Sequence, residues 1–158
     1  KGKLWLIGGD DSDGGQKNDI WSTTNGVDWV MESENANFSG RIYHDVVVFK
    51  EKLILIGGYD EYFDDNGIQG RMYNNDVWSS DDGIVWIKLT SSANFSPRNG
   101  HKVASFNNKI WVVAGSTDIF YSNDIWSSVN GVDWVLEVES APFSIRGYFQ
   151  LVNRSLGR

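Results

Sequence analysis

"NDIWSSVNGVDWVLEVESAPFSIR", residues 123–146, is the stretch of sequence that decides the fold. The same phrase occurs with small changes at residues 18–41 and 75–98. Ten positions are identical in all three copies, among them the opening Asn-Asp pair, two Trp and the closing Arg. The spacers between the copies differ in length. A fixed pattern with a variable loop is typical of a repeated supersecondary unit.

Each unit is predicted to contain four short strands. Residues 44–49 ("HDVVVF") are apolar and β-branched, as in a strand that is buried on both faces. The run "LILIGG" (53–58) follows, and its two glycines let the chain turn with positive φ. Two further strands, in "NDVWSS" and "IVWIKL", flank Asp82-Gly83, and an Asx-Gly pair favours a two-residue hairpin turn of type I′. Four antiparallel strands in every unit indicate the blades of a β-propeller.

These motifs resemble the kelch repeat, found in the propellers of kelch proteins and galactose oxidase. They are R-x-x-H, a hydrophobic run ending in Gly-Gly, Asn-Asp-hydrophobic-Trp and a second Trp. The resemblance covers essentially all 158 residues and implies an all-β propeller of four-stranded blades. In the kelch strand order a to d, strands b, c and d of one blade are expected over residues 1–40. Complete blades are expected over residues 41–97 and 98–145, and a final strand a over residues 146–158.

Three blades' worth of chain is less than the usual four to eight of a closed propeller. An isolated arc would leave sheet faces and a strand edge open, which favours association. The chain is therefore expected to be half of a six-bladed ring or an excerpt of a longer propeller. The expected partner is a second copy that closes the ring as a homodimer, or the remainder of that longer propeller.

The formal net charge is −7, from 21 acidic and 14 basic residues. This balance argues against nucleic acid as a partner, because phosphates attract clustered Lys and Arg, and against an anionic membrane surface. No apolar run reaches the roughly 20 residues that a membrane-spanning helix needs. The chain has no Cys, which excludes disulfides, thiolate metal sites and Cys nucleophiles. We expect no cofactor and no bound metal.

Three arginines at one repeated position are candidates for ligand binding. Each stands at the entry to strand a, the strand nearest the propeller axis, and they are Arg41, Arg98 and Arg146. The resemblance to kelch proteins that capture acidic peptides implies that they line a pocket at the central opening. A guanidinium offers a rigid fork of donors for carboxylates. The alternative is that each Arg pairs with an Asp of a neighbouring blade; the repeated Asp residues are Asp19, Asp76 and Asp124.

Two histidines follow these arginines by three residues. They are His44 and His101, and Phe149 takes the third position. Both histidines are candidate ligand-binding residues at the mouth of the propeller. Packing and hydrogen bonding are favoured over metal binding, because two His alone make an incomplete ligand set.

The predicted loops between strands b and c vary while the frame stays constant. They span residues 10–17, 59–74 and 116–122, and such loops on a rigid scaffold commonly carry binding specificity. The acidic residues of the first two loops leave calcium binding as an alternative, although neither loop has EF-type spacing. The second loop adds four aromatic candidate binding residues, Tyr59, Tyr62, Phe63 and Tyr73.

The repeated Trp and Asn residues are predicted to be structural. The Trp side chains are expected to pack between adjacent blades, with sugar stacking as the alternative. The Asn side chains are expected to bond backbone groups at the start of strand c. The residues concerned are Trp21, Trp29, Trp78, Trp86, Trp126 and Trp134, with Asn18, Asn75 and Asn123.

The function favoured by the sequence is a non-catalytic binding scaffold. Its ligand is a protein, peptide or glycan, and anionic groups on it would suit the arginines. The alternative is a carbohydrate-active propeller enzyme of sialidase or oxidase type. Ser79-x-Asp81-x-Gly83-x-x-Trp86 is similar to the Asp-box hairpin of sialidases, although the other copies lack the Asp. The copper site of galactose oxidase uses a Tyr crosslinked to Cys, which this chain lacks, and no catalytic residue is predicted.

Overall fold

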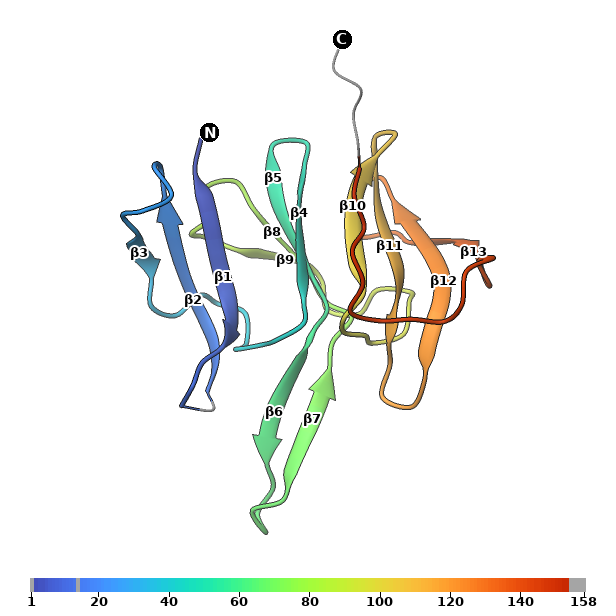
Figure 1. The fold of residues 1–158 in the computed structure, drawn as a ribbon, viewed down its shortest axis with the longest axis horizontal. Coiled ribbons are helices and arrows are strands. Elements are labelled where there is room, and N and C mark those ends of the chain that lie inside the picture. Colours follow the sequence, from blue (N-terminus) through green and yellow to red (C-terminus); the bar gives the residue numbers. More distant parts are fainter. Residues whose placement is uncertain (1, 14, 154–158) are drawn as a thin grey trace.

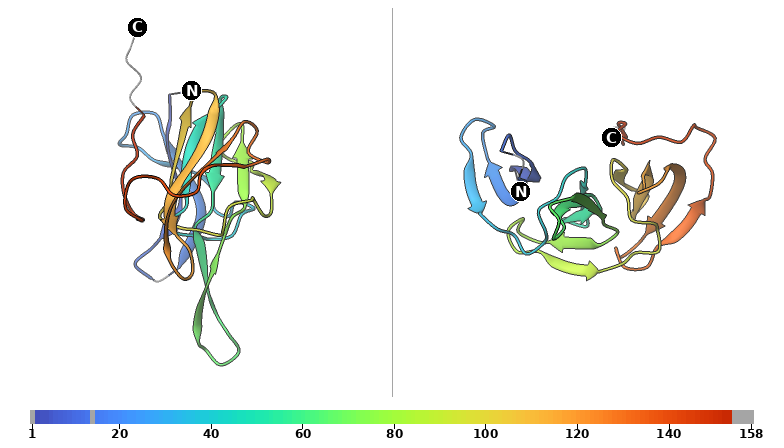
Figure 2. Two further views of the ribbon diagram at one scale, coloured as in Figure 1. Left: turned by 90° about the vertical axis from the view of Figure 1, so that its right-hand side faces the viewer. Right: turned by 90° about the horizontal axis from the view of Figure 1, so that it is seen from below.

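The computed structural model describes residues 2–13 and 15–153. This part of the chain is all-β and contains no helix. Three antiparallel sheets stand side by side in an open arc, and a separate two-stranded hairpin projects from the middle of it (Figures 1 and 2). The sheets that come first and last along the chain stand at opposite ends of the arc (Figure 2).

The three sheets follow one another along the chain. The first sheet contains β1 (Leu4–Asp10), β2 (Gln16–Thr23) and β3 (Val30–Ser33), in the order β1-β2-β3. The second sheet contains β4 (Asp45–Phe49), β5 (Lys52–Ile56), β8 (Val77–Ser80) and β9 (Ile87–Thr90), in the order β4-β5-β8-β9. The third sheet contains β10 (Lys102–Phe106), β11 (Lys109–Ser116), β12 (Tyr121–Ser128) and β13 (Val135–Val138), in chain order. The first sheet thus has one strand fewer than the other two.

The hydrophobic core lies between neighbouring sheets. In β5, Leu55 packs in the cluster shared with the first sheet, whereas Ile54 and Ile56 pack in the cluster shared with the third. Both faces of the strand are therefore covered, which explains its uninterrupted apolar run.

Aromatic pairs join the sheets. Phe38, in the connection after β3, meets Trp86 of the second sheet edge to face at 5.5 Å. Phe95 meets Trp134 of the third sheet in the same way at 5.0 Å. The predicted packing of Trp side chains between sheets is confirmed at these positions, where Trp86 is 1% and Trp134 5% exposed. Trp29, at the same repeat position in the first sheet, is 40% exposed, and among the described residues no Phe packs on it as Phe38 packs on Trp86.

The repeated Asn holds the end of each sheet to the connection that follows it. The side-chain amide of Asn75 donates to the carbonyl oxygens of Ala93 and Phe95, both at 2.9 Å. Asn18 and Asn123 make the equivalent pair of bonds. The predicted structural role is correct, but the predicted partners at the start of strand c are wrong, because the bonded carbonyl oxygens lie 18 and 20 residues further along the chain.

The predicted two-residue hairpin turn is wrong. Gly83 has a φ of 82°, but Asp82 has no positive φ, as a type I′ turn would require. A loop over residues 81–86 is formed instead, and β9 begins at Ile87. The Asp82 carboxylate accepts hydrogen bonds from the backbone amides of Ile84 and Val85, which lowers its pKa. The Asp82 side chain thereby provides hydrogen-bond acceptors for backbone amides of the loop, in place of the hydrogen bonding of a tight turn.

The projecting hairpin occupies most of the longest predicted loop. Residues 59–74 contain β6 (Tyr59–Phe63) and β7 (Gln69–Tyr73), paired antiparallel. The Asp64 carboxylate caps the turn by accepting from the amides of Asn66 and Ile68. This segment is therefore a defined structural element of the molecule.

The end of the described chain forms no strand. A strand was expected over residues 146–158, but residues 146–153 are irregular, and residues 154–158 lie outside the described residues. The Asn153 side chain donates to the backbone oxygen of Ser105, so this segment rests on the open face of the third sheet. β1, the strand it was expected to join, lies across the arc (Figure 2).

Candidate functional site

Four tyrosines gather where the hairpin leaves the arc. The rings of Tyr43 and Tyr148 are 5.0 Å apart, and those of Tyr43 and Tyr59 5.8 Å. Tyr59 and Tyr73, at the base of the hairpin, are 5.4 Å apart. We call these four residues the tyrosine cluster. They come from segments far apart in sequence, and the inner ends of the second and third sheets bring them together.

Two members of the tyrosine cluster have an unusual backbone. Tyr43 has a φ of 55° and Tyr148 a φ of 58°, a left-handed conformation that costs a bulky residue energy. Both stand two residues after a repeated Arg, and the third such position is Gly100, with a φ of 57°. Hydrogen bonds from Gly100 N to Tyr43 O and from Tyr148 N to Gly100 O link the three positions. Such strain in exposed aromatic residues is typical of functional sites.

Arg71 of the hairpin completes this surface. Its guanidinium lies 5.0 Å from the centre of the Tyr59 ring, and its Nε is 3.4 Å from the Glu61 carboxylate. Burial raises the pKa of both Tyr59 and Tyr148, so these phenols keep their protons at neutral pH. The Tyr148 hydroxyl donates to the side-chain oxygen of Asn99. The cluster thus presents neutral rings and hydroxyls beside one cation.

A groove lies on each side of the hairpin. One, of about 440 Å³, is bounded by Gln16 and Gly40 on the first-sheet side and by Tyr62 and Phe63 of the hairpin. The other, of about 460 Å³, lies between Arg71 and Tyr73 on one side and the β11–β12 connection, including Phe120, on the other. Gln16 also accepts a hydrogen bond from the backbone amide of Glu61, which ties the hairpin to the first sheet.

The predicted aromatic residues of the hairpin divide into two groups. Tyr59 is buried and Tyr73 half-buried within the tyrosine cluster. Phe63, near the hairpin tip, is 70% exposed, and Tyr62 beside it is also exposed. Ile68 and Met72 of the same hairpin add further exposed apolar surface.

The arginines Arg41 and Arg98 are not free to bind a ligand. Arg41 donates to both carboxylate oxygens of Asp76, at 2.7 and 3.0 Å, and is 1% exposed. Arg98 donates in the same way to Asp124, at 2.7 and 2.8 Å. The prediction that both line an open pocket is corrected here, and the alternative weighed with it, pairing with Asp, is what the structure has. The reason is that a buried guanidinium requires a carboxylate partner.

Arg146 differs from its two counterparts. It is exposed, and its guanidinium donates to the backbone and side-chain oxygens of Ser144. It makes no ion pair with a described residue. The structure therefore leaves only this one of the three predicted arginines open.

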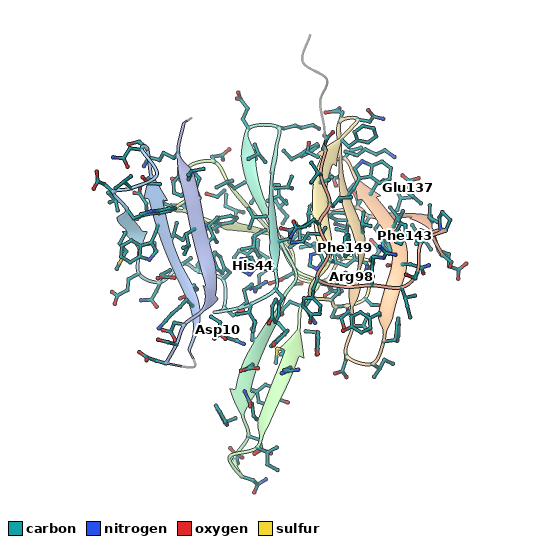
Figure 3. All side chains as sticks on the ribbon, viewed as in Figure 1. Asp10, His44, Arg98, Glu137, Phe143 and Phe149 are labelled. Atoms are coloured by element: carbon teal, nitrogen blue, oxygen red, sulfur yellow. The ribbon has the colours of Figure 1, made fainter. Side chains whose placement is uncertain are left out.

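His101 is buried within the protein, and His44 is half-buried. His44 Nε2 lies 3.0 Å from the carbonyl oxygen of Ile7, between β1 and β4 (Figure 3). Burial, and then the charge of Arg41, lowers the pKa of His44 to about 4. Burial, and then the charge of Arg98, lowers the pKa of His101 to about 3. Both are neutral at physiological pH. The prediction that His101 contacts a ligand is corrected, because its side chain is 1% exposed.

In the first acidic loop, the Asp11 carboxylate bonds to groups of the same loop. Asp11 accepts from the amides of Asp13 and Gly15 and pairs with Lys17 at 2.6 Å. Across residues 2–13 and 15–153, no three His, Cys, Asp or Glu residues are grouped so that they could hold a metal ion. No helix long and apolar enough to cross a membrane is present in that same part of the chain.

The all-β fold of successive antiparallel sheets agrees with comparisons to known proteins. A family model described as the DUF6242 beta propeller domain matches residues 1–135. The chain belongs to this family. The solved structure of YjhT is similar in fold, with a TM-score of 0.70 and 15% sequence identity. The match covers 93% of this chain and 52% of that chain, so the chain spans about half the length of YjhT. At this identity the likeness shows the propeller fold alone.

Sequence reasoning missed Tyr43, Tyr148 and Arg71. A signal for the two tyrosines was present, because their repeat position holds Gly in the remaining copy. A bulky residue in place of a repeated Gly indicates either a change in backbone or a tolerated strain. No comparable signal marked Arg71, whose proximity to Tyr59 depends on the pairing of β6 with β7.

Proposed function

We propose that this propeller is a non-catalytic binding scaffold of kelch type. Its ligand is a protein, peptide or glycan that contacts the tyrosine cluster and the projecting hairpin. The observation that carries the proposal is the pair of left-handed tyrosines, Tyr43 and Tyr148, each about half exposed at the inner end of the arc. Tyrosine suits such a surface because its ring stacks and its hydroxyl forms hydrogen bonds at low entropic cost.

The hairpin adds the features of an interaction surface. Phe63, Ile68 and Met72 expose apolar side chains on an element that projects from the sheets (Figure 1). Exposed apolar groups gathered on one projection are typical of binding sites. Arg71 offers one cation beside the rings, which supports a ligand that carries an anionic or polar group.

An enzyme of sialidase type is the second candidate, and the residues favour it less. Such an enzyme would need arginines that hold the carboxylate of its substrate, whereas Arg41 and Arg98 already hold Asp76 and Asp124. A tyrosine nucleophile would need a lowered pKa, and the pKa values of Tyr59 and Tyr148 are raised by burial. These contacts support binding over catalysis.

The test is a glycan and peptide array followed by variants of the strongest hit. Tyr43→Gly should preserve the fold, because Gly100 already occupies the equivalent left-handed position, and should weaken binding at least about tenfold by removing one stacking ring. Phe63→Ala should weaken binding comparably. Val48→Ala, an exposed apolar position on β4, serves as the control and should bind normally.

Two results would overturn the proposal. Equal binding by Tyr43→Gly, Phe63→Ala and the parent chain would show that the tyrosine cluster and the hairpin do not contact the ligand. Turnover of a fluorogenic sialoside by the purified chain would show that the protein is an enzyme of sialidase type and would contradict the proposal of a non-catalytic scaffold.

A further inference from the structure

One contact between neighbouring sheets occurs twice inside the chain. In each case a Phe-x-x-Arg segment reaches from the end of one sheet to the next. The Arg donates two hydrogen bonds to an Asp, and that Asp accepts the indole N–H of a Trp two residues later. The Phe ring packs on a second Trp of the same sheet. The first occurrence joins Phe38 and Arg41 to Asp76, Trp78 and Trp86; the second joins Phe95 and Arg98 to Asp124, Trp126 and Trp134.

The donor half of a third contact stands at the end of the third sheet. Arg146 Nε donates to the Ser144 carbonyl and Nη2 to the Ser144 hydroxyl, both at 2.9 Å. Arg41 uses Ser39 in the same two ways. The Arg146 guanidinium lies 5.3 Å from the ring centre of Phe143, and that of Arg98 lies 5.3 Å from Phe95. The segment therefore has the conformation of its paired counterparts although its carboxylate is missing.

The acceptor half of that contact stands on the first sheet. Asp19 accepts the indole N–H of Trp21 at 2.7 Å, the distance found for Asp76 with Trp78 and for Asp124 with Trp126. Asp19 makes no ion pair with any residue in 2–13 or 15–153. Trp29, the platform for the incoming Phe, is 40% exposed, whereas its paired counterparts are buried.

The two halves lie at opposite ends of the arc. Figure 2 shows the first and third sheets at its two extremes, and Figure 3 shows Phe143 at the third sheet, on the side of the molecule away from β1. Within one copy Arg146 therefore has no access to Asp19. The first sheet also has only three strands, and the segment after Arg146 holds the place in the repeat that β4 and β10 hold after Arg41 and Arg98.

We propose that two copies of this chain join head to tail and close a ring through these halves. Arg146 of each copy pairs with Asp19 of the other, and Phe143 packs against Trp21 and Trp29. Residues 149–153 leave the open face of the third sheet and add the missing strand beside β1. Both contacts form at once, because each copy supplies one donor half and one acceptor half.

Charge and continuity together indicate a second copy as the occupant. The donor half is a cation with an aromatic ring, and the acceptor half is an anion with the half-buried indole of Trp21 and the exposed indole of Trp29. They repeat an interface that the chain already forms twice with the same residue types. The arc also matches 52% of the YjhT chain, so two arcs amount to about one such chain.

The test is the mass of the 158-residue chain in solution, measured by sedimentation equilibrium. The expected mass is twice 17.8 kDa. Asp19→Arg or Arg146→Asp alone should place like charges at both contacts and raise the dimer dissociation constant about 100-fold or more. Asp65→Arg and Lys50→Asp reverse charges at exposed positions away from the proposed contacts and should leave the dimer intact.

Mixing the two variants is the decisive arm. In a mixed dimer, unaltered Arg146 meets unaltered Asp19 at one contact, and the two substituted side chains meet with opposite charges at the other. An equimolar mixture should therefore recover the dimer. The same holds for a chain carrying both substitutions. Circular dichroism of each variant establishes that it is folded.

Several outcomes would overturn the proposal. A parent chain that is monomeric at 100 µM (about the concentration at which weak dimers form) has no such interface. Dimers that survive both single substitutions use another surface. Open oligomers larger than two exclude the closed pair, and a folded mixture that stays monomeric excludes the Arg146–Asp19 contact.

Discussion

Arg41 and Asp76 hold each other through two hydrogen bonds, of 2.7 and 3.0 Å, with the guanidinium 1% exposed. Arg41 also donates to the carbonyl of Gly57 and to Ser39, so its polar hydrogens have partners on several sides. Asp76 in turn accepts the indole N–H of Trp78. One buried ion pair thus joins the connection after the first sheet to two strands of the second.

Removing this arginine should destabilise the fold strongly. Arg41→Ala leaves the Asp76 carboxylate buried without its cation, and such a loss costs about 3–5 kcal/mol in the free energy of unfolding. Arg71→Ala makes the same substitution at an exposed arginine and should cost less than about 1 kcal/mol. Urea denaturation of both variants measures the difference. Equal costs would contradict a structural role for Arg41.

Acid should destabilise the protein through its histidines. The folded pKa values of His44 (about 4) and His101 (about 3) lie below the ordinary value of 6.5. The unfolded chain therefore takes up protons first as pH falls below about 6.5, and stability that is complete above that pH is lost on the way down to the folded pKa values. Each histidine should contribute a slope of about 1.4 kcal/mol per pH unit between pH 6 and pH 4.

The matched variant is His101→Phe, because Phe149 occupies the equivalent repeat position. It should reduce the slope by about one histidine's contribution, while the carboxylates common to both proteins cancel in the comparison. Denaturation at a series of pH values between 4 and 7 measures this. An unchanged slope would show that His101 already titrates normally in the folded state.

Two glycines with the same backbone angle should respond differently to a methyl group. Gly26 and Gly83 have φ values of 78° and 82° at the same repeat position. A Cβ on Gly83 would lie 2.6 Å from the Trp5 ring, whereas one on Gly26 has nothing within 4 Å. Gly26→Ala should cost about 1–2 kcal/mol from the left-handed backbone alone. Gly83→Ala should cost about 1–3 kcal/mol more, because Trp5 must move.

Thermal denaturation of the two alanine variants gives the comparison directly. Identical melting temperatures would mean that Trp5 does not pack over Gly83. That result would contradict the contact described between the first and second sheets.

The repeated Asn should prove structural when it is removed. Asn75→Ala leaves the carbonyl oxygens of Ala93 and Phe95 without their donor and should lower the free energy of unfolding by about 1–3 kcal/mol. Asn35→Ala, at an exposed position, should change it by less than about 0.5 kcal/mol. Chemical denaturation distinguishes them, and a neutral Asn75→Ala variant would contradict this role.

The sequence was sufficient for the propeller because its signals are local and repeat. The run "LILI" is buried on both faces of β5, and the repeated Asn makes the same contacts in all three sheets. The repeated Trp residues Trp86 and Trp134 each pack on a Phe of the preceding connection. A spacing that recurs three times fixes which residues are equivalent. The bounds of β4, Asp45–Phe49, follow the predicted range of residues 44–49 to within one residue.

The candidate site was predictable only in part. Tyr59, Tyr62, Phe63 and Tyr73 stood out as aromatic residues in a variable loop, but the hairpin that separates their roles did not. The side chain of Asp82 replaced the expected tight turn because a carboxylate can cap amides that the backbone alone would leave unpaired. Whether a loop or a tight turn forms here depends on where the side-chain oxygen lies, and the sequence pattern does not specify that position.

By itself the sequence determined the repeated unit, the all-β class and the pairs of residues that recur. Only the tertiary structure decided which of those residues remain available. Arg41, Arg98 and Arg146 are one residue type at one repeat position, yet two are buried against a carboxylate and the third is exposed. The physical reason is that burial and pairing require a neighbouring sheet, and the third sheet is the last in this arc.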